Sequence, residues 1–319
     1  MHRVQSAIPE PPGVGDAVVM DTTTDISPAH ASPTTHGALP DALRLGHARL
    51  VVTDLRRSVP FYEDVIGLHA QERGDDRIVQ LATADGAVVL ELEERPDAVR
   101  AGRHAGLYHV ALLYPTRAEL AAALHRIART RTMIDGASDH GTHEAIYLPD
   151  PDGNGLELAA DRPRDVWPDL SSIDGIRPRA LDMQALLGLV EEAQVADRAA
   201  AGLEVGHLHL HVGDIAEASS FYVDVVGFEV QTALPVAAFV SAGGYHHHLA
   251  YNTWRGEGVP PVPADAVGLA FWTIVLPTSA DVDALEARAA DAGIAAERID
   301  GAVALRDPWG MQLRARAAD

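Results

Sequence analysis

Histidines and a glutamate stand at positions where they could bind a metal ion or move a proton. His47 and His207 each follow a glycine in the similar segments GHARLVV and GHLHLHV, and His246–His248 form an unbroken triplet. Glu157 lies between two leucines, so strand alternation would place its carboxylate on the face opposite them. Imidazole and carboxylate are common metal ligands, and imidazole titrates near neutral pH. Metal binding and proton transfer are therefore the chemistry that these residue types could perform.

The composition excludes several kinds of chemistry and partner. The chain has 319 residues, with 46 acidic and 25 basic side chains and a formal net charge of −21. A surface this acidic repels phosphate backbones and anionic lipids, so we expect no nucleic-acid partner and no membrane partner. The sequence has no cysteine, which excludes disulfides and thiolate catalysis. No window is apolar over about 18 consecutive residues and the start lacks a signal-peptide core, so we expect a cytoplasmic protein.

The elements that carry these histidines belong to an internal sequence duplication. Residues 46–70 and 206–230 align at an offset of 160, and the shared residues include the Gly-His pair and a Phe-Tyr pair. A second pair of similar segments begins at Gly106 and Gly268. Each half then closes with a similar turn and strand, DPDGNGLEL in the first and DPWGMQLRA in the second. The chain is therefore a tandem repeat of a half of about 115 residues.

Each half divides into two smaller modules of the type βαβββ. In the first module an alternating strand precedes Asp54, a helix N-cap candidate, and Gly67 can end that helix. Four such modules predict an α+β fold. We expect four regions along the chain: a flexible leader at 1–42, a first domain at 43–162, a linker with an amphipathic helix at 163–203, and a second domain at 204–319.

These motifs resemble the vicinal oxygen chelate superfamily, which includes extradiol dioxygenases, glyoxalase I and antibiotic-resistance proteins. The segments GLYHVALLYP, SDHGTHEAIYLPDPDGNGLEL and SAGGYHHHLAYNTW are more specifically similar to bacterial two-domain catechol-2,3-dioxygenases. The resemblance covers about residues 44–316. It implies that paired modules curl into two half-open barrels, with metal ligands from first and last strands pointing into a cavity.

The resemblance also assigns candidate ligand positions to this sequence. The first strands of the four modules contribute His47, His109, His207 and Phe271. The last strands of the second and fourth modules contribute Glu157 and Arg314, and those of the first and third fall near Glu91 and within His246–His248. A benzene ring has no lone pair and a guanidinium stays protonated, so Phe271 and Arg314 cannot serve as ordinary ligands.

The third metal ligand depends on how the modules pair. Pairing in chain order joins His47 to His109 and Glu157, whereas pairing the second module with the third brings in His207 instead. We favour the second arrangement, because it also adds residues that match the extradiol enzymes. These are His247 as the acid–base residue, Tyr147 as a substrate hydrogen-bond donor, and His140, His143 and His248 as further substrate-binding candidates.

The function that the resemblance implies is extradiol cleavage of catechol or a substituted catechol by O₂. Two histidines and one carboxylate form the facial triad of non-haem Fe(II) oxygenases, and Mn²⁺ is the alternative ion. The partners expected are a small aromatic diol and O₂. Members of this superfamily often associate, and exposed strand edges would also permit a homo-oligomer here.

Two other functions stay open from the sequence. A glyoxalase I-type lyase would use His47, Glu91, His109 and Glu157 around Ni²⁺ or Zn²⁺, and it requires pairing in chain order. A metal-free drug-binding protein would use an apolar cleft, for which the second half offers Trp254, Trp272 and Trp309.

Overall fold

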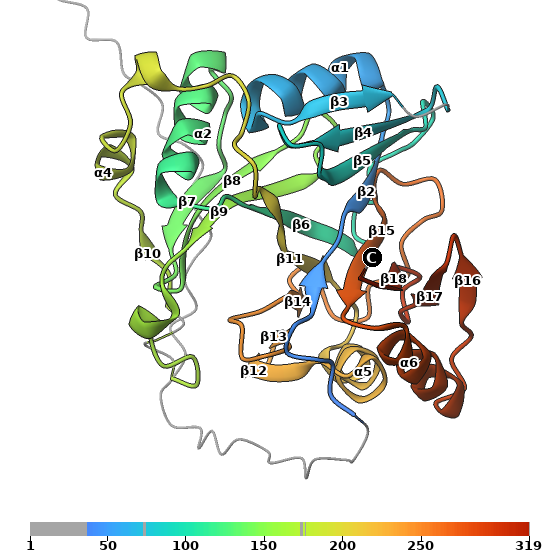
Figure 1. Cartoon of the computed structure of the whole chain (residues 1–319). Coiled ribbons are helices and arrows are strands. Elements are labelled where there is room, and N and C mark those ends of the chain that lie inside the picture. The colour runs from blue at the N-terminus through green and yellow to red at the C-terminus, as the bar shows by residue number, and fades with distance from the viewer. Residues whose placement is uncertain (1–36, 73–74, 173–174, 176, 319) are drawn as a thin grey trace, which may run out of the picture. The chain divides into compact units, whose positions relative to one another are not determined.

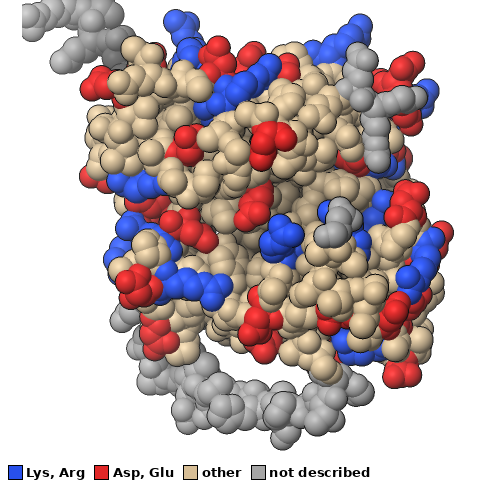
Figure 2. All heavy atoms as spheres, viewed as in Figure 1, with Lys and Arg blue, Asp and Glu red and all other residues tan. Residues whose placement is uncertain are grey.

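The computed structural model describes residues 37–318, except 73, 74, 173, 174 and 176. The predicted leader lies outside the described residues as far as residue 36. None of the helices in the described part of the chain has the length and apolar composition needed to cross a bilayer. Figure 2 shows acidic and basic side chains interspersed over one face.

The first sheet is built from the first and fourth modules. Its strands are β1 (Arg44–Leu45), β2 (Ala48–Val52), β3 (His69–Glu72), β4 (Ile78–Ala82), β5 (Val88–Glu94), β15 (Gly268–Leu276), β16 (Glu297–Ile299), β17 (Ala302–Arg306) and β18 (Gln312–Ala317). They lie in the order β16-β17-β18-β15-β2-β5-β4-β3, and β1 pairs with β15.

The second sheet is built from the second and third modules. Its strands are β6 (Gly106–Leu113), β7 (Gly136–Asp139), β8 (His143–Pro149), β9 (Gly155–Asp161), β10 (Arg179–Ala180), β11 (Glu204–His211), β12 (Glu229–Leu234), β13 (Ala237–Ser241) and β14 (Leu249–Asn252). Their order is β10-β7-β8-β9-β6-β11-β14-β13-β12.

The module pairing is therefore the crossed one. The first strands of modules two and three, β6 and β11, pair antiparallel, and so do β2 and β15 of modules one and four. Figure 1 shows both central pairs. Within every module the first and last strands pair in parallel. Each open sheet thus combines strands from both sequence halves, and the prediction of four βαβββ modules is confirmed.

Each module carries a helix between its first two strands. The helical elements of the described chain are α1 (Leu55–Phe61), η1 (Tyr62–Ile66), α2 (Arg117–Thr130), η2 (Arg164–Val166), α4 (Met183–Leu187), η3 (Glu192–Gln194), α5 (Ile215–Ser219), η4 (Ser220–Val226) and α6 (Ser279–Asp291). Asp54 caps α1 by accepting a hydrogen bond from the backbone N–H of Arg56, as predicted. Gly67 ends η1 at a φ of 90°, which only glycine adopts without strain.

The predicted amphipathic helix of the linker 163–203 is wrong beyond its first turn. Helix α4 covers only Met183–Leu187, and the chain turns at Gly188. One side chain of α2 bonds to two carbonyl groups that a longer helix would use: the Nε2 atom of His125 lies 3.1 and 3.0 Å from the carbonyl oxygens of Leu187 and Val190. Tertiary bonding to α2 therefore overrides the local helical periodicity.

The predicted leader is also too long at its C-terminal end. Leu39 is only 4% exposed and belongs to the hydrophobic core, and its backbone N–H donates to the carbonyl of Gly227. Leu39 therefore packs against the second half of the chain, whereas residues 37, 38, 41 and 42 are exposed. A single buried leucine in a polar segment has no periodicity that could have predicted this contact.

A buried arginine on α2 joins three parts of the fold. Arg126 has no exposed surface, and it donates to the carbonyl oxygens of Val65, Ile66 and Ala196 at 3.3, 2.9 and 3.3 Å. Arg288 on α6 repeats this arrangement in the other half, with bonds of 3.1 and 2.8 Å to the last two carbonyls of η4, but it is only partly buried. Both side chains satisfy the C-terminal carbonyl groups of a π-helix.

Replacing Arg126 by leucine should lower the free energy of unfolding by about 3 kcal/mol, because several buried carbonyl groups lose their donors at once. The matched change Arg288→Leu should cost only about 1 kcal/mol, because water can reach that site. Urea unfolding followed by circular dichroism measures both values. Equal losses in the two variants would contradict this account of the buried contacts.

Candidate metal centre

Three side chains of the second sheet converge on one point. His109 comes from β6, Glu157 from β9 and His207 from β11. The Nε2 atoms of His109 and His207 lie 3.0 and 3.2 Å from the same carboxylate oxygen of Glu157. All three side chains are buried, and their ligand atoms lie within 4.8 Å of one another. The favoured crossed pairing is what brings His207 to Glu157.

A glycine allows the two inner strands to approach. A Cβ atom on Gly155 would lie 1.9 Å from the carbonyl oxygen of Tyr108, so any other residue would push β9 away from β6. The parallel pairing then sets Ala111 opposite Glu157. Alternation turns Leu156 and Leu158 into the core and Glu157 toward the histidines, as the sequence predicted.

The electrostatics of the site favour a cation. Burial alone would raise the pKa of Glu157, but His207 and His109 outweigh it and hold that pKa well below its usual range. Burial lowers the pKa of His207, which favours its neutral, ligating form. The Nε2 atom of His109 and the Oε1 atom of Glu157 are buried and make no hydrogen bond of good geometry. Buried polar atoms without hydrogen bonds are rare and call for another partner.

The spacing of these atoms fits one shared ion. Two ligand atoms about 2.1 Å from a metal and at right angles to each other lie about 3.0 Å apart. The distances of 3.0 and 3.2 Å from the Glu157 oxygen to the two imidazole nitrogens match that value. Two imidazoles and one carboxylate suit a divalent first-row transition metal with open positions.

A chain of hydrogen bonds leads from the C-terminal end of β9 to His247. The Nε2 atom of His246 lies 3.1 Å from Oδ1 of Asp161, and its Nδ1 lies 2.9 Å from Nδ1 of His247. The ring of His247 packs 4.1 Å from that of His207, between centroids. Burial, His207 and His246 hold the pKa of His247 well below its usual value, so the ring is neutral.

The histidine triplet is a loop, which corrects the expectation of a strand. Strand β14 begins only at Leu249, so His246–His248 precede the last strand of the third module and do not lie within it. Both His246 and His247 line the cavity. His248 does not line it: its Nδ1 accepts from the backbone N–H of Ala242, and its ring packs on Tyr245.

Tyr147 and His140 form a second hydrogen-bonded pair at the cavity. The phenol oxygen lies 2.7 Å from Nε2 of His140, and Tyr147 is the cross-strand partner of Glu157. Burial and then the charge of Glu157 raise the pKa of Tyr147, which keeps the phenol protonated as a donor. Burial and then His143 lower the pKa of His140 to about 4, so that ring is neutral at pH 7.

His143 links the centre to the Asp161–His246 pair. Its Nε2 lies 3.1 Å from Oε1 of Glu157, and its ring stacks on His246 at 4.7 Å between centroids. His143, Asp161 and His246 form a second group whose ligand atoms also lie within 4.8 Å of one another. Of the three substrate-binding candidates, the structure thus brings His140 and His143 to the cavity.

The corresponding positions of the first sheet form a different cluster. Arg49 donates to the carboxylate of Glu91 at 2.9 and 2.7 Å, and Nε2 of His47 lies 3.6 Å from the same carboxylate. The guanidinium of Arg314 lies over the ring of Phe271, 3.6 Å from its centroid. The lyase set is therefore divided between two sheets: neither His47 nor Glu91 belongs to a metal-competent group among the described residues.

The cavity at the metal centre has a volume of about 390 Å³. The lining residues that sequence reasoning missed include three aromatic side chains: Tyr108, His209 and Phe239. The spacing of two between the histidines of HLHLH could have indicated His209, because it shares a strand face with His207. Of the tryptophans proposed for a drug cleft, Trp254 lies here, whereas Trp272 is fully buried in the core.

Comparison with known proteins gives two sequence matches. A family model described as the Glyoxalase/Bleomycin resistance protein/Dioxygenase superfamily matches residues 44–158 and 204–314. A Bacillus subtilis (strain 168) protein named catechol-2,3-dioxygenase is 43% identical over 274 residues, which is 83% of this chain and 93% of that protein.

Solved structures with low sequence identity share the fold. A structure from Bacillus subtilis subsp. subtilis str. 168 has a TM-score of 0.61 and 12% identity, over 88% of this chain and 86% of that one. Glyoxalase I from Zea mays has a TM-score of 0.53 and 16% identity, over 86% of this chain and 92% of that one. At such identities the likeness concerns the fold alone.

Proposed function

The chain belongs to the Glyoxalase/Bleomycin resistance protein/Dioxygenase superfamily, and we propose that it is an extradiol dioxygenase that cleaves catechol or a substituted catechol with O₂. The observation that carries the proposal is the convergence of His109, Glu157 and His207 beside His247 and Tyr147 in one cavity. The 43% identical relative, named catechol-2,3-dioxygenase, supports the same reaction.

The ion proposed is Fe(II), with Mn²⁺ as the alternative. His109, Glu157 and His207 would hold it on one side and leave positions free for both oxygens of the diol and for O₂. When bound, the ion would acidify the diol and bring diol and O₂ together. The reaction places both atoms of O₂ in the ring-opened product, so no further reductant is needed.

The protein groups around the ligands would control protons and orientation. If Nε2–H of His246 donates to Asp161, then Nδ1 of His246 accepts from Nδ1–H of His247. Nε2 of His247 is then left as the acceptor for a substrate proton, and it can return that proton during ring opening. The neutral phenol of Tyr147 would donate to a substrate oxygen and strengthen that bond as negative charge develops.

The apolar part of the cavity would hold the aromatic ring. Phe239 packs against the ring of His247 at 5.2 Å between centroids, and Trp254 packs against His209 at 5.2 Å. A planar diol entering between them would exchange its hydration for contact with aromatic rings. Burial lowers the pKa of His209, so its ring is neutral at pH 7 and this wall of the cavity gains no positive charge from it.

Anaerobic reconstitution tests the proposed function. The purified protein would be loaded with Fe(II) or Mn²⁺, freed of unbound ion, and mixed with catechol and O₂ while absorbance and oxygen uptake are recorded. A yellow ring-opened product formed with equal consumption of O₂ supports the proposal. If the metal-loaded protein consumes no O₂ with catechol or alkylcatechols but isomerises a glutathione hemithioacetal, the dioxygenase proposal is wrong and the lyase function takes its place.

The choice between His207 and His47 gives a separate prediction. His207→Ala should weaken metal retention by about 100-fold, because it removes one of three ligands. His47→Ala should leave retention unchanged, because His47 lies at Glu91 in the other sheet. Metal content after dialysis against a weak chelator measures both. Loss of metal in His47→Ala with retention in His207→Ala would reverse the assignment.

A further inference from the structure

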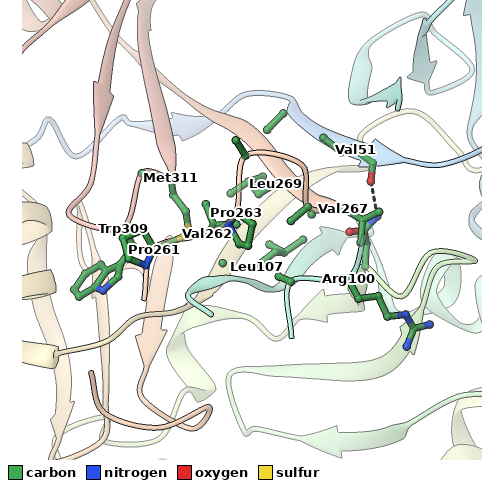
Figure 3. A pocket seen from close by; sticks show the side chains of 18 of the residues that line it. Val51, Arg100, Leu107, Pro261, Val262, Pro263, Val267, Leu269, Trp309 and Met311 are labelled. Atoms are coloured by element: carbon green, nitrogen blue, oxygen red, sulfur yellow. Dashed lines mark hydrogen bonds between the residues drawn. The ribbon is translucent and has the colours of Figure 1, made fainter. Parts of the chain in front are cut away.

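A second and larger cavity lies between the two sheets, and none of the three metal ligands lines it. Its volume is about 660 Å³, within the range of small-molecule sites. Val51 and Leu269 line it from the first sheet, and Leu107 lines it from the second. Figure 3 shows Trp309 and Arg100 at opposite ends, with apolar side chains between them. We call this space the inter-sheet cavity.

Positive charge is concentrated at this cavity in a strongly acidic protein. Four arginines line it: Arg95, Arg100, Arg255 and Arg306. The carboxylate that lines it, Asp152, is already bound by Arg57 at 2.5 Å and by the Thr53 hydroxyl at 2.6 Å. Of the four arginines, Arg95 is paired with Glu93.

The other three arginines have no carboxylate partner within the part of the chain that the structure describes. Arg255 and Arg306 donate to the backbone carbonyls of His104 and Gly310, at 3.1 and 3.0 Å. Arg100 lies against Gly153, with its guanidinium carbon 3.2 Å from the position of a Cβ there. Arg100 and Arg306 are exposed to solvent, whereas Arg255 is only partly exposed and donates to a single backbone carbonyl, so its other N–H groups could bind an anion in the cavity.

The two duplicated turns have diverged on the side of this cavity. The turn DPDGNG places Asp152 and Asn154 at positions where DPWGMQ places Trp309 and Met311. Trp309 and Met311 are 5% and 2% exposed, and both line the cavity. The second turn therefore contributes an apolar wall where the first contributes polar groups.

We propose that the inter-sheet cavity is a binding site for a small organic carboxylate with an aromatic or branched apolar body. Its carboxylate would pair with Arg255, whose guanidinium lies beside Gly106 and is only partly exposed. Its apolar body would pack along Leu107, Val262 and Met311 toward Trp309. The volume and the apolar wall favour an organic acid over inorganic phosphate, which would leave most of the space unfilled.

The site adjoins the metal cavity through two chain segments. Leu107 precedes Tyr108 on β6, and Arg255 follows Trp254; Tyr108 and Trp254 both line the metal cavity. Their rings pack 5.4 Å apart between centroids. An acid in the inter-sheet cavity would thus contact the residues next to that aromatic pair, but its binding does not depend on the proposed reaction.

Isothermal titration of the full-length protein with 2-naphthoate tests the site, with neutral 2-naphthamide and inorganic phosphate as comparison ligands. We expect 2-naphthoate to bind with a stoichiometry of one, and the other two to bind at least about tenfold more weakly. Arg255→Gln should weaken naphthoate binding about tenfold or more, and Arg255→Lys should restore part of it. The control Arg56→Gln, at an exposed arginine on α1, should bind as the parent does.

Two filling variants identify which cavity is occupied. Ala101→Trp would fill the inter-sheet cavity from the loop that carries residue 101, and it should abolish naphthoate binding. Leu234→Trp would narrow the metal cavity instead, and naphthoate binding should be unchanged. Binding that survives Arg255→Gln and Ala101→Trp but disappears in Leu234→Trp would overturn the proposal. Equal affinity for naphthoate and naphthamide, or no binding at millimolar concentration, would also overturn it.

Discussion

Glu157→Gln is expected to lose the bound metal and to lower kcat/KM by roughly a thousandfold or more, provided the protein is an extradiol dioxygenase. The carboxylate oxygen that lies about 3 Å from both His109 and His207 is the shared centre of the ligand set. Glutamine keeps the shape of the side chain but removes its charge, and a neutral amide is a poor ligand for a divalent transition metal. Metal analysis after gel filtration and oxygen uptake with catechol measure the two effects.

Glu91→Gln provides the matched control for Glu157→Gln. Glu91 is also fully buried and occupies the equivalent last strand of the first module. Its carboxylate holds Arg49 and Gln80, so the change should cost stability without loss of metal. Thermal unfolding separates the two outcomes. One equivalent of iron and unchanged turnover in Glu157→Gln would remove Glu157 from the ligand set and contradict the site as described.

The pattern of four βαβββ modules could be predicted because its causes are local. The duplication fixed the number of modules, and alternation fixed which side of β9 bears Glu157. The crossed pairing of modules could only be favoured, because the side chains that decide it meet only in three dimensions. His207 and Glu157 are 50 residues apart, and nothing in either segment alone shows that they touch.

The errors have a common physical origin in long-range contacts. The linker helix stops after Met183–Leu187 because His125 on α2 bonds to its carbonyls, and Leu39 is ordered by Gly227. The histidine triplet is a loop because its rings are fixed by Asp161 and by the backbone N–H of Ala242. Local periodicity cannot report such bonds, since each partner lies far away in the sequence.

His247→Asn is expected to lower kcat by about 100- to 10,000-fold while the protein still retains its metal, which is the range for loss of a general acid–base group. His247 packs on His207 but is not one of the three converging ligands, so binding of the ion and transfer of the proton can be separated. Stopped-flow mixing of the metal-loaded variant with catechol and O₂ should show diol binding followed by slow product formation.

The neighbouring His248→Asn is the natural control for this variant, because His248 faces Tyr245 and Ala242 instead of the cavity. It should keep kcat within about threefold of the parent, since it touches no reacting group. The kcat of Asp161→Asn should lie between those of the His247 and His248 variants. The change alters the tautomer of His246, and it reaches the Nδ1 of His247 only through the ring of His246. Equal losses in the His247 and His248 variants would mean that the loop matters for folding alone. If turnover is slow only in His247→Asn and added imidazole partly restores it, the ring of His247 is the group that transfers the substrate proton.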